Sequence, residues 1–458
     1  MIRIFNRYIP SRILILLGGE FAVISISFSL AILIHYRQGS ALVFHDQHTL
    51  WKILTVAALA LLCSHYMELY DPRRLASPAE MYPRILKLVG VLSFVLAGLT
   101  YIFPRFLVGR YVFLTGLFFL ALTWILWRWI YDRLIFLPVL RERIYLLGNG
   151  ERARRILEAV RNRGALGMDV IGWAGEAGDN SLTCESTGKI LQDLGKKRAV
   201  DRVIVALTDR RSKMPVNELL ELRLKGVRIE DGTTLLEKIS GQIEVDELQP
   251  SWMIFGDGFH FSPRNRFLRR TLSTLLALTL SILTLPLIPI IALLIRLTSP
   301  GPILYRQKRV GLRGEVFNCY KFRTMQPEAE ADSGPTWASD EDPRVTTAGR
   351  FLRRTRLDEI PQLWNVIRGD MAFVGPRPER PEFVAELGRE IPYYYLRHMT
   401  RPGITGWAQI NYGYGSSTEE SKEKLRYDLY YLRNASVMLD VLIVFYTIRT
   451  VLVGRGVR

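Results

Sequence analysis

The chain has 458 residues, of which 49% are hydrophobic, and its 61 lysines and arginines outnumber 44 aspartates and glutamates to give a net charge of +17. This length predicts two or three domains. No nucleic-acid partner is expected, because the basic residues flank apolar runs instead of forming a stripe on a soluble fold. The three cysteines lie far apart without a CxxC pair, so neither a zinc site nor a disulfide framework is indicated.

Four apolar runs occupy residues 1–140, at about 13–34, 50–67, 85–103 and 111–130. Each approaches the roughly 20 residues that a helix needs to cross a bilayer, so we expect a four-helix transmembrane bundle. Basic residues precede the first run, separate the second from the third and follow the fourth, which predicts that both ends of this bundle are cytoplasmic. Glu20 lies inside the first run, where it is either a functional acid or a polar tether to a neighbouring helix.

Residues 141–250 alternate predicted strands and helices, which predicts a Rossmann-like cytoplasmic domain with a parallel sheet. The turn GNGERA at 148–153 resembles the GxGxxA phosphate-binding pattern, and Asp169 follows at the spacing of a ribose-binding acid. Tight strand-to-helix turns also use glycine without any ligand. Because the chain has no Tyr-x-x-x-Lys pair, nucleotide binding by this segment stays open.

The apolar run at 272–297 is long enough to cross a bilayer, but Pro286 and Pro289 interrupt it. Basic residues flank both of its ends, and a crossing helix would leave one of those clusters outside the cell. We therefore predict a re-entrant membrane helix over 267–299, broken at Pro286, which enters and leaves on the cytoplasmic face. A fifth crossing helix is the alternative.

A pair of carboxylates, Asp358 and Glu359, precedes Pro361 in a strongly basic neighbourhood. The surrounding arginines are Arg350, Arg353, Arg354, Arg356 and Arg368. Carboxylates ringed by guanidinium groups suit a divalent metal and a phosphate-bearing substrate. The simpler interpretation is that Asp358 only caps the helix that begins near Pro361.

Six sequence motifs occur in order through the C-terminal half: YKFRTM at 320–325, DPRVT at 342–346, LDEIPQLWN at 357–365, RGDM at 368–371, VGPRP at 374–378 and RPGITGW at 401–407. With them, residues 264–458 resemble the bacterial sugar transferases, which are monotopic polyprenyl-phosphate phosphoglycosyl transferases. The whole chain resembles the long form of this family, whose members prime exopolysaccharide, capsule or O-antigen synthesis. The resemblance implies a monotopic α/β catalytic domain on the cytoplasmic face of the bacterial inner membrane.

The resemblance also implies a reaction, in which a sugar-1-phosphate passes from a UDP-sugar to a polyprenyl phosphate such as undecaprenyl phosphate, with release of UMP and a requirement for Mg²⁺. It makes Asp358 the nucleophile of a covalent phosphosugar-aspartate intermediate, and it gives Glu359 a part in placing Mg²⁺. The cationic residues carried over as substrate-binding are Lys321, Arg323, Arg353, Arg377 and Arg401. The chain departs from many members at the helix break, where Leu285-Pro286 replaces Ser-Pro.

Several alternatives accompany this interpretation. Lys321 and Arg323 alternate with aromatic residues, as on a solvated strand face, and Arg401 before Pro-Gly is also compatible with a simple turn. A membrane-bound NAD-dependent nucleotide-sugar dehydratase or epimerase would use the turn at 148–153, but the chain lacks the Tyr/Lys pair that such an enzyme needs. A non-enzymatic scaffold with a decayed site conflicts with the intact carboxylates. A homodimer is expected, and the transferred sugar is not identified by the sequence.

Overall fold

The computed structural model describes residues 2–4, 7–9, 11–36, 49–67, 69–70, 78–104, 110–135, 141–148, 150–161, 167–173, 188–193, 200–207, 214–248, 262–327, 342–413 and 417–453. The chain divides into two compact units, which are described separately. The first comprises residues 1–3 and 8–239, and the second comprises residues 4–7 and 240–458. Two short strands, β1 (Ile2–Ile4) and β2 (Arg7–Ile9), pair with each other near the N-terminus.

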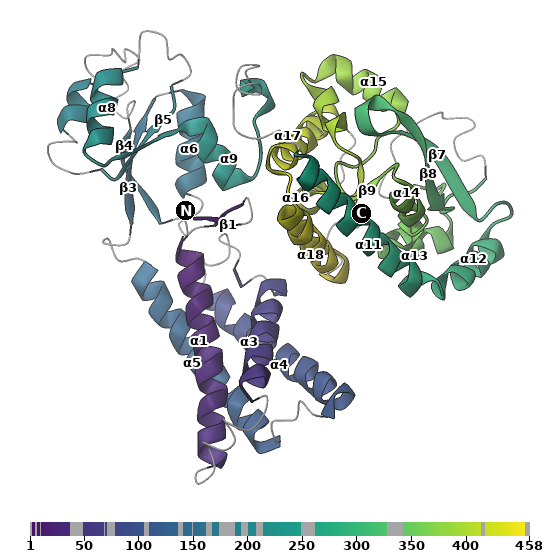
Figure 1. The fold of residues 1–458 in the computed structure, drawn as a ribbon, viewed down its shortest axis with the longest axis horizontal. Coiled ribbons are helices and arrows are strands. Elements are labelled where there is room, and N and C mark those ends of the chain that lie inside the picture. Colours follow the sequence, from purple (N-terminus) through teal and green to yellow (C-terminus); the bar gives the residue numbers. More distant parts are fainter. Residues whose placement is uncertain are drawn as a thin grey trace. The chain divides into compact units, whose positions relative to one another are not determined.

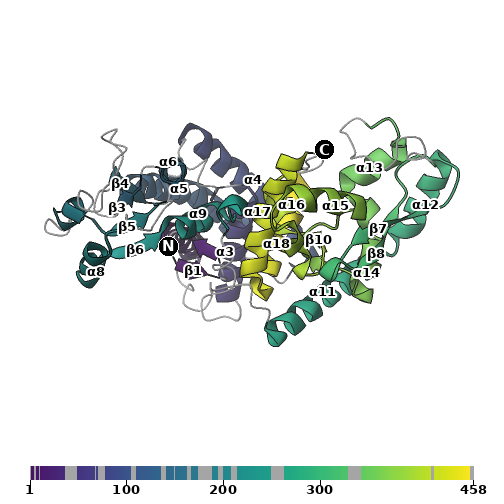
Figure 2. The same ribbon diagram turned by 90° about the horizontal axis from the view of Figure 1, so that it is seen from above.

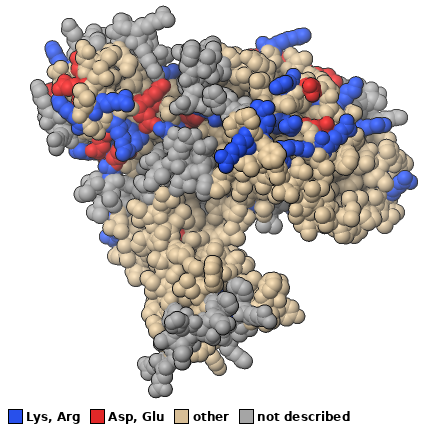
Figure 3. Space-filling model, viewed as in Figure 1, with Lys and Arg blue, Asp and Glu red and all other residues tan. Residues whose placement is uncertain are grey.

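Four long helices form the N-terminal part of the first unit: α1 (Ser11–His35), α3 (Thr49–Tyr66), α4 (Pro78–Ile102) and α5 (Arg110–Ile135). Each contains a segment that is long and apolar enough to cross a membrane. Helices α1 and α5 lie side by side (Figure 1), and a Cβ on Gly19 would stand only 1.9 Å from the ring of Trp127. The glycine therefore permits this close approach. On the face seen in Figure 3, the visible surface of these helices carries almost no charge.

A buried ion pair crosses the helices at Glu20. Its carboxylate Oε1 lies 2.5 Å from Nη2 of Arg128, and both side chains are fully buried. The indole of Trp124 donates to the same oxygen at 3.0 Å, and the hydroxyl of Tyr70 donates to Oε2. Removing one partner of a buried ion pair leaves an uncompensated charge, so these groups depend on each other. Of the two interpretations of Glu20, the structure shows the polar tether.

A four-stranded parallel sheet follows, in the order β4 (Met168–Trp173), β3 (Glu142–Leu147), β5 (Arg202–Val205) and β6 (Arg228–Asp231). Alternate residues of β3 face opposite sides, as the pleat requires. Ile144 packs with helices α6 (Glu151–Arg161) and α9 (Gly232–Ser240), whereas Tyr145 packs with α8 (Val216–Leu224). Helices therefore cover both faces of the sheet.

The two residues that suggested nucleotide binding lie at opposite ends of this sheet. Gly148 follows the carboxyl end of β3, whereas Asp169 pairs with Arg143 at the amino end. At 3.3 Å per residue, these positions are separated by about 17 Å along the strand. Asp169 is therefore not placed where a ribose-binding acid would act. Gly148 has a φ of +144°, and a Cβ there would stand 2.8 Å from the Ala206 carbonyl, so close backbone packing explains the glycine.

The second unit begins with η4 (Val245–Glu247), α11 (Pro263–Thr284) and α12 (Leu287–Thr298), and continues with the antiparallel pair β7 (Leu304–Val310) and β8 (Val316–Phe322). Short elements follow: η5 (Leu312–Gly314) between those strands, then α13 (Thr347–Thr355), η6 (Leu357–Glu359), α14 (Gln362–Arg368) and β9 (Ala372–Val374). The last elements are α15 (Pro381–Glu390), η7 (Tyr394–Met399), β10 (Gly403–Thr405), α16 (Trp407–Asn411), α17 (Thr418–Asn434) and α18 (Val437–Val453).

Helices surround the short parallel pair β9 and β10 in both ribbon views (Figure 1 and Figure 2). The main core collects apolar side chains from α14, α17 and α18, among them Val366, Leu429 and Ile443. The visible surface over α11 and α12 is largely free of charge, whereas Lys and Arg gather in a band across the same unit (Figure 3). Helix α11 is also long and apolar enough to cross a membrane.

The apolar segment breaks at Leu285 and Pro286, which separate α11 from α12. The Leu285 amide donates to Ile282 O instead of to Ser281 O, which shifts the ladder from an i−4 to an i−3 bond. The hydroxyl of Thr284 lies 3.5 Å from the Ser281 carbonyl that loses its usual partner. The shorter hydrogen bond of this hydroxyl, at 2.7 Å, goes to Leu280 O. Pro289 lies in the first turn of α12, where a helix has no need of its N–H.

Candidate active site

The site is built on the ends of β8 and α13, which are fastened together at Thr324. The carbonyl of Thr324 accepts from the Thr346 amide at 3.0 Å, and the Thr346 hydroxyl caps α13 by accepting from Gly349 N. A Cβ on Gly349 would stand 2.0 Å from the Thr324 oxygen, so only glycine lets the helix approach this closely. Helix α13 therefore starts at a fixed point relative to the strand that carries Lys321.

Asn365 holds the next helix, α14, against the same strand. Its Nδ2 donates to Asn318 O at 2.8 Å and its Oδ1 accepts from Tyr320 N at 3.1 Å, so the fully buried side chain pairs with β8 much as a neighbouring strand would. Carboxamides satisfy both a donor and an acceptor in this way. This places the start of α14 beside β8.

The two carboxylates lie in η6, between these anchored helices. Helix α13 ends at Arg356, which takes a left-handed conformation with φ 56°. This reversal leads directly into η6, where Asp358 and Glu359 are both buried. The N-cap position of α14 is Pro361, and no side-chain cap bond is formed there. Asp358 is therefore not a helix cap, which removes the simpler interpretation of the pair.

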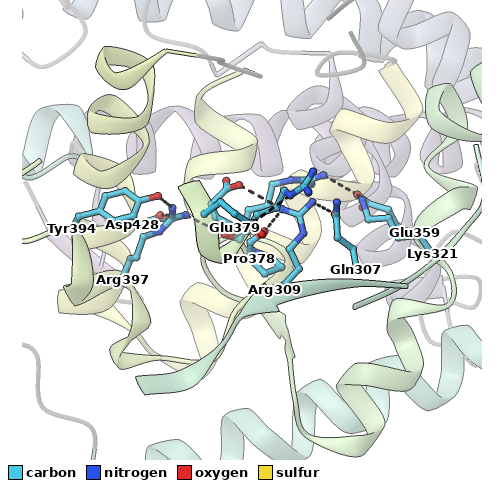
Figure 4. Close-up of polar contacts among 12 residues, drawn as sticks. Gln307, Arg309, Lys321, Glu359, Pro378, Glu379, Tyr394, Arg397 and Asp428 are labelled. Carbon is cyan, nitrogen blue, oxygen red and sulfur yellow. Dashed lines mark hydrogen bonds and ion pairs between the residues drawn. The ribbon is translucent and has the colours of Figure 1, made fainter. Parts of the chain in front are cut away.

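Glu359 is surrounded by positive charge. Its Oε1 lies 3.2 Å from Nη2 of Arg377 and 3.4 Å from Nζ of Lys321, and its Oε2 lies 3.8 Å from Nη1 of Arg356. Figure 4 shows the contact with Lys321. Burial alone would raise the pKa of Glu359, but the three cations outweigh it and lower the pKa to about 2. Glu359 is therefore permanently ionised near neutral pH.

Asp358 has the opposite environment. It is as buried as Glu359, yet among the described residues its carboxylate makes no hydrogen bond or ion pair within 4 Å. Burial, assisted by the negative charge of Glu359, raises the pKa of Asp358, although Lys321, Arg377 and Arg353 act against that change. Neighbouring groups whose pKa values are pushed apart are suited to different roles. Asp358 is the more basic and less occupied carboxylate of the two.

The peptide that carries Arg377 is held from two sides by other arginines. Arg397 donates to Arg377 O at 3.1 Å, and Arg309 donates to Pro378 O at 3.0 Å (Figure 4). Arg397 is 5% exposed and pairs with buried Asp428 at 2.9 Å. These contacts fix the backbone from which Arg377 reaches Glu359. No sequence pattern distinguishes Arg309 or Arg397 from the many other basic residues.

The remaining predicted substrate-binding residues have other described partners. Arg353 donates to the Thr324 hydroxyl at 3.0 Å and lies close enough to lower the pKa of Asp358, so it belongs to the same neighbourhood. Arg323 is buried and bonds the carbonyls of Ser299 and Pro300, where α12 ends. Arg401 donates to Gly369 O, beyond the end of α14. The structure thus brings Lys321, Arg353 and Arg377 to the carboxylates, while the described bonds of Arg323 go to Ser299 and Pro300 and that of Arg401 goes to Gly369.

The oxygen donors of the site are compatible with the Mg²⁺ that the family resemblance implies. Mg²⁺ is usually bound by one or two carboxylates together with substrate phosphates and water, and seldom by a complete protein cage. The adjacent carboxylates of Asp358 and Glu359 supply such a partial set, and Asp358 is not occupied by a described side chain. Within the described ranges, no group of three or more His, Cys, Asp or Glu side chains is arranged to hold a metal. The donors present fit Mg²⁺ brought with a phosphate-bearing substrate.

A cavity of about 180 Å³ adjoins Glu359. Its wall includes Arg356 and Glu359 from the site, Leu280 and Thr284 from α11, and Thr450 from α18. One small space is therefore bordered both by the end of the apolar helix α11 and by the ionised carboxylate. The sequence does not reveal this cavity, because its wall comes from segments up to 170 residues apart.

The second unit therefore combines two buried carboxylates, cationic neighbours and an apolar cavity with a helix that is long and apolar enough to cross a membrane. Residues 264–454 match the family described as bacterial sugar transferase. The chain is 34% identical over 321 residues to the UDP-glucose:undecaprenyl-phosphate glucose-1-phosphate transferase of Escherichia coli (strain K12), covering 67% of each protein. The chain belongs to the bacterial sugar transferase family, and by family it is a phosphoglycosyl transferase, as predicted.

Other relatives differ in the sugar that their names specify. The chain is 43% identical over 222 residues to the UDP-N-acetylgalactosamine-undecaprenyl-phosphate N-acetylgalactosaminephosphotransferase of Aeromonas hydrophila, covering 48% of this chain and 52% of that protein. It is 28% identical over 337 residues to the undecaprenyl-phosphate galactose phosphotransferase of Salmonella typhimurium, covering 69% of each. The chain thus spans about half the length of the Aeromonas relative. These likenesses do not select a sugar.

Proposed function

We propose that the chain transfers a sugar-1-phosphate from a UDP-sugar to a polyprenyl phosphate and releases UMP. The observation that carries the proposal is the contrast between the two carboxylates: Glu359 is held by three cations, whereas Asp358 is buried beside them without a described side-chain partner. The names of the relatives support a UDP-sugar and undecaprenyl phosphate as the substrates.

The proposed reaction has two displacements at the same phosphorus. A carboxylate oxygen of Asp358 attacks the β-phosphorus of the UDP-sugar, the bond to the bridging oxygen breaks, and UMP leaves with that oxygen. An oxygen of the polyprenyl phosphate then attacks the phosphorus of the phosphosugar-aspartate, and the Asp358 carboxylate is released. Each step exchanges one P–O bond for another, and phosphoryl transfer of this kind depends chiefly on positioning and charge neutralisation.

The side chains around Asp358 have separate parts in this scheme. Arg377 and Lys321, anchored on Glu359, present positive charge to the phosphate oxygens as negative charge builds up. Glu359 keeps these cations in place and, with Asp358, offers oxygens to Mg²⁺. A bound Mg²⁺ would supply further neutralisation of the diphosphate. Burial keeps water away from Asp358, which protects an acyl phosphate from hydrolysis.

The membrane arrangement is proposed to be that of a monotopic enzyme in the bacterial inner membrane, with α11 and α12 re-entering at Pro286 and the catalytic unit on the cytoplasmic face. The broken helix and the weakly charged surface over α11 and α12 support it. Single cysteines at Arg264 and Arg306, after removal of the native cysteines, should both be inaccessible to an impermeant label outside intact cells. Labelling of either position from outside would favour a crossing helix. The homodimer stays a prediction.

The experiment that tests the proposed function is UMP release by the purified full chain with undecaprenyl phosphate, Mg²⁺ and a panel of UDP-sugars. UDP-glucose, UDP-galactose and their N-acetylamino forms should be compared, because the relatives' names include glucose, galactose and N-acetylgalactosamine. UMP release that requires one of these donors supports the proposal. Absence of UMP release with every donor would refute it for this panel.

A further inference from the structure

The surface that lines the cavity beside Glu359 is chiefly apolar. Ile360 and Leu363 border it near the carboxylates, and Phe373, Ile404 and Ile410 complete much of the wall. An apolar cavity of this kind favours an apolar occupant over water, because water needs two to four polar partners to be held in place. Its wall therefore differs in character from the charged group that surrounds Glu359.

Most polar groups on the wall are already satisfied within the protein. The hydroxyl of Thr450 donates to Tyr446 O at 3.0 Å, and that of Thr447 donates to Ile443 O at 2.8 Å. The hydroxyl of Thr284 is likewise engaged, with Leu280 O at 2.7 Å. The exception is Gln409, whose Oε1 is buried without a hydrogen-bond partner. An occupant of the cavity therefore needs to make few polar contacts with this part of the wall.

The volume of the cavity limits the size of this occupant. A dry apolar cavity of about 150 Å³ can hold benzene, which has six carbon atoms. The volume here is about 180 Å³, enough for one branched five-carbon unit but too small for a whole lipid tail or a nucleoside. The five-carbon isoprene unit is the repeating element of a polyprenyl chain.

We propose that this cavity receives the first isoprene unit of the polyprenyl phosphate acceptor, with the phosphate directed toward Arg356 and the neighbouring Asp358; this inference rests on the proposed function. When the acceptor phosphate approaches Asp358, the isoprene unit bonded to it must leave the bilayer with it. Each methylene then exposed to water would weaken binding about fourfold. Transfer from lipid to an apolar cavity avoids that loss, because the two environments are similarly apolar.

The position of the cavity explains how such a unit arrives. Leu280 and Thr284 belong to the last turn of α11, immediately before the break at Pro286. The helix that contacts lipid therefore also forms part of the cavity wall. Arg269 and Arg270, near the start of α11, bind Asp440 and the Val366 carbonyl, which ties this helix to the catalytic core. The lipid-facing helix and the carboxylates are thus held in one rigid arrangement.

Filling the cavity tests the proposal. Thr450→Phe places a ring in the cavity, and Ile448→Phe adds the same ring on an exposed face of α18 as the matched control. Two measurements separate the half-reactions. The burst of UMP from UDP-sugar without acceptor reports the first, and the transfer to undecaprenyl phosphate reports the second. Thr450→Phe should raise the acceptor KM, or slow transfer, by about tenfold or more, the effect of excluding as few as two methylene groups. Its UMP burst should persist, and the control should behave as wild type.

Unchanged transfer by a folded Thr450→Phe protein would overturn the proposal, and so would a selective rise in the UDP-sugar KM, which would assign the cavity to the sugar and to Gln409. A second measurement needs no variant: the wild-type protein should discriminate between short polyprenyl phosphates and straight-chain alkyl phosphates of equal carbon number. Equal use of both acceptors would also overturn it. A wild-type protein that gives no UMP burst would instead refute the proposed function.

Discussion

Glu359→Gln removes the negative charge that holds three cations in place. The pKa of Glu359 falls from 4.5 to about 2, and because one pKa unit corresponds to 1.36 kcal/mol, the ionised form is stabilised by about 3 kcal/mol. A carboxylate with a lowered folded pKa contributes this stability fully above its unfolded pKa near 4.5 and loses it as the pH falls toward 2. At pH 7, the variant should therefore lose about 3 kcal/mol in local stability, with no further change above about pH 6.

Hydrogen exchange of peptides covering 347–368 measures this loss locally, without requiring the whole chain to unfold in one step. Glu382→Gln is the matched control, since Glu382 is 57% exposed and only 3.6 Å from Arg380, and an exposed pair is worth at most about 1 kcal/mol. UMP release by Glu359→Gln should be severely reduced and partly restored by raised Mg²⁺. If exchange in 347–368 is equal in the two variants, Glu359 does not organise the site.

Three further predictions concern the surroundings. Pro286→Ala should restore a regular helix, because proline costs about 3 kcal/mol in a helix interior, and it should lower UMP release strongly. Pro289→Ala should have little effect. Equal behaviour of the two variants in topology and activity assays would contradict this prediction. Arg397→Met should lower stability by about 3–5 kcal/mol by leaving Asp428 buried and unpaired, and adding Asp428→Leu should restore most of it in thermal melting. Burial, with a contribution from Arg397, lowers the pKa of His398 to about 4, so the free energy of unfolding should fall by up to about 3 kcal/mol as the pH falls from 6.5 to 4. His398→Gln should remove this part of the pH dependence. An unchanged pH profile in that variant would contradict the assignment to His398.

The carboxylate pair stood out in the sequence because two adjacent acids lie among five arginines. The sequence could not decide which arginines reach them. Arg323 and Arg401 stand in family motifs just as Arg377 does, yet their described hydrogen bonds go to carbonyls at the ends of helices. A guanidinium group bonds a carbonyl as readily as a phosphate oxygen. Only the fold determines which acceptor is nearby.

Contacts between residues far apart in the sequence could not be predicted either. Glu20 stood out as an acid in an apolar run, but its partner Arg128 lies 108 positions away and only the packing of α1 on α5 reveals it. The break at Pro286 was predictable, because proline has no N–H to donate. Which carbonyl accepts the Thr284 hydroxyl could not be predicted, and the structure gives its shorter bond to Leu280 O. Local sequence patterns thus predicted where the buried acid and the helix break lie, and tertiary contacts showed which residues they interact with.

Trapping the phosphosugar on the enzyme tests the central claim most directly. The purified chain would be mixed with a UDP-sugar labelled at the β-phosphorus, without acceptor, and then quenched and digested. We predict one label per chain, confined to the peptide that contains Asp358, released by undecaprenyl phosphate and absent from a folded Asp358→Asn protein. Label elsewhere, label retained by Asp358→Asn, or wild-type transfer by that variant would contradict the assignment of Asp358 as the nucleophile.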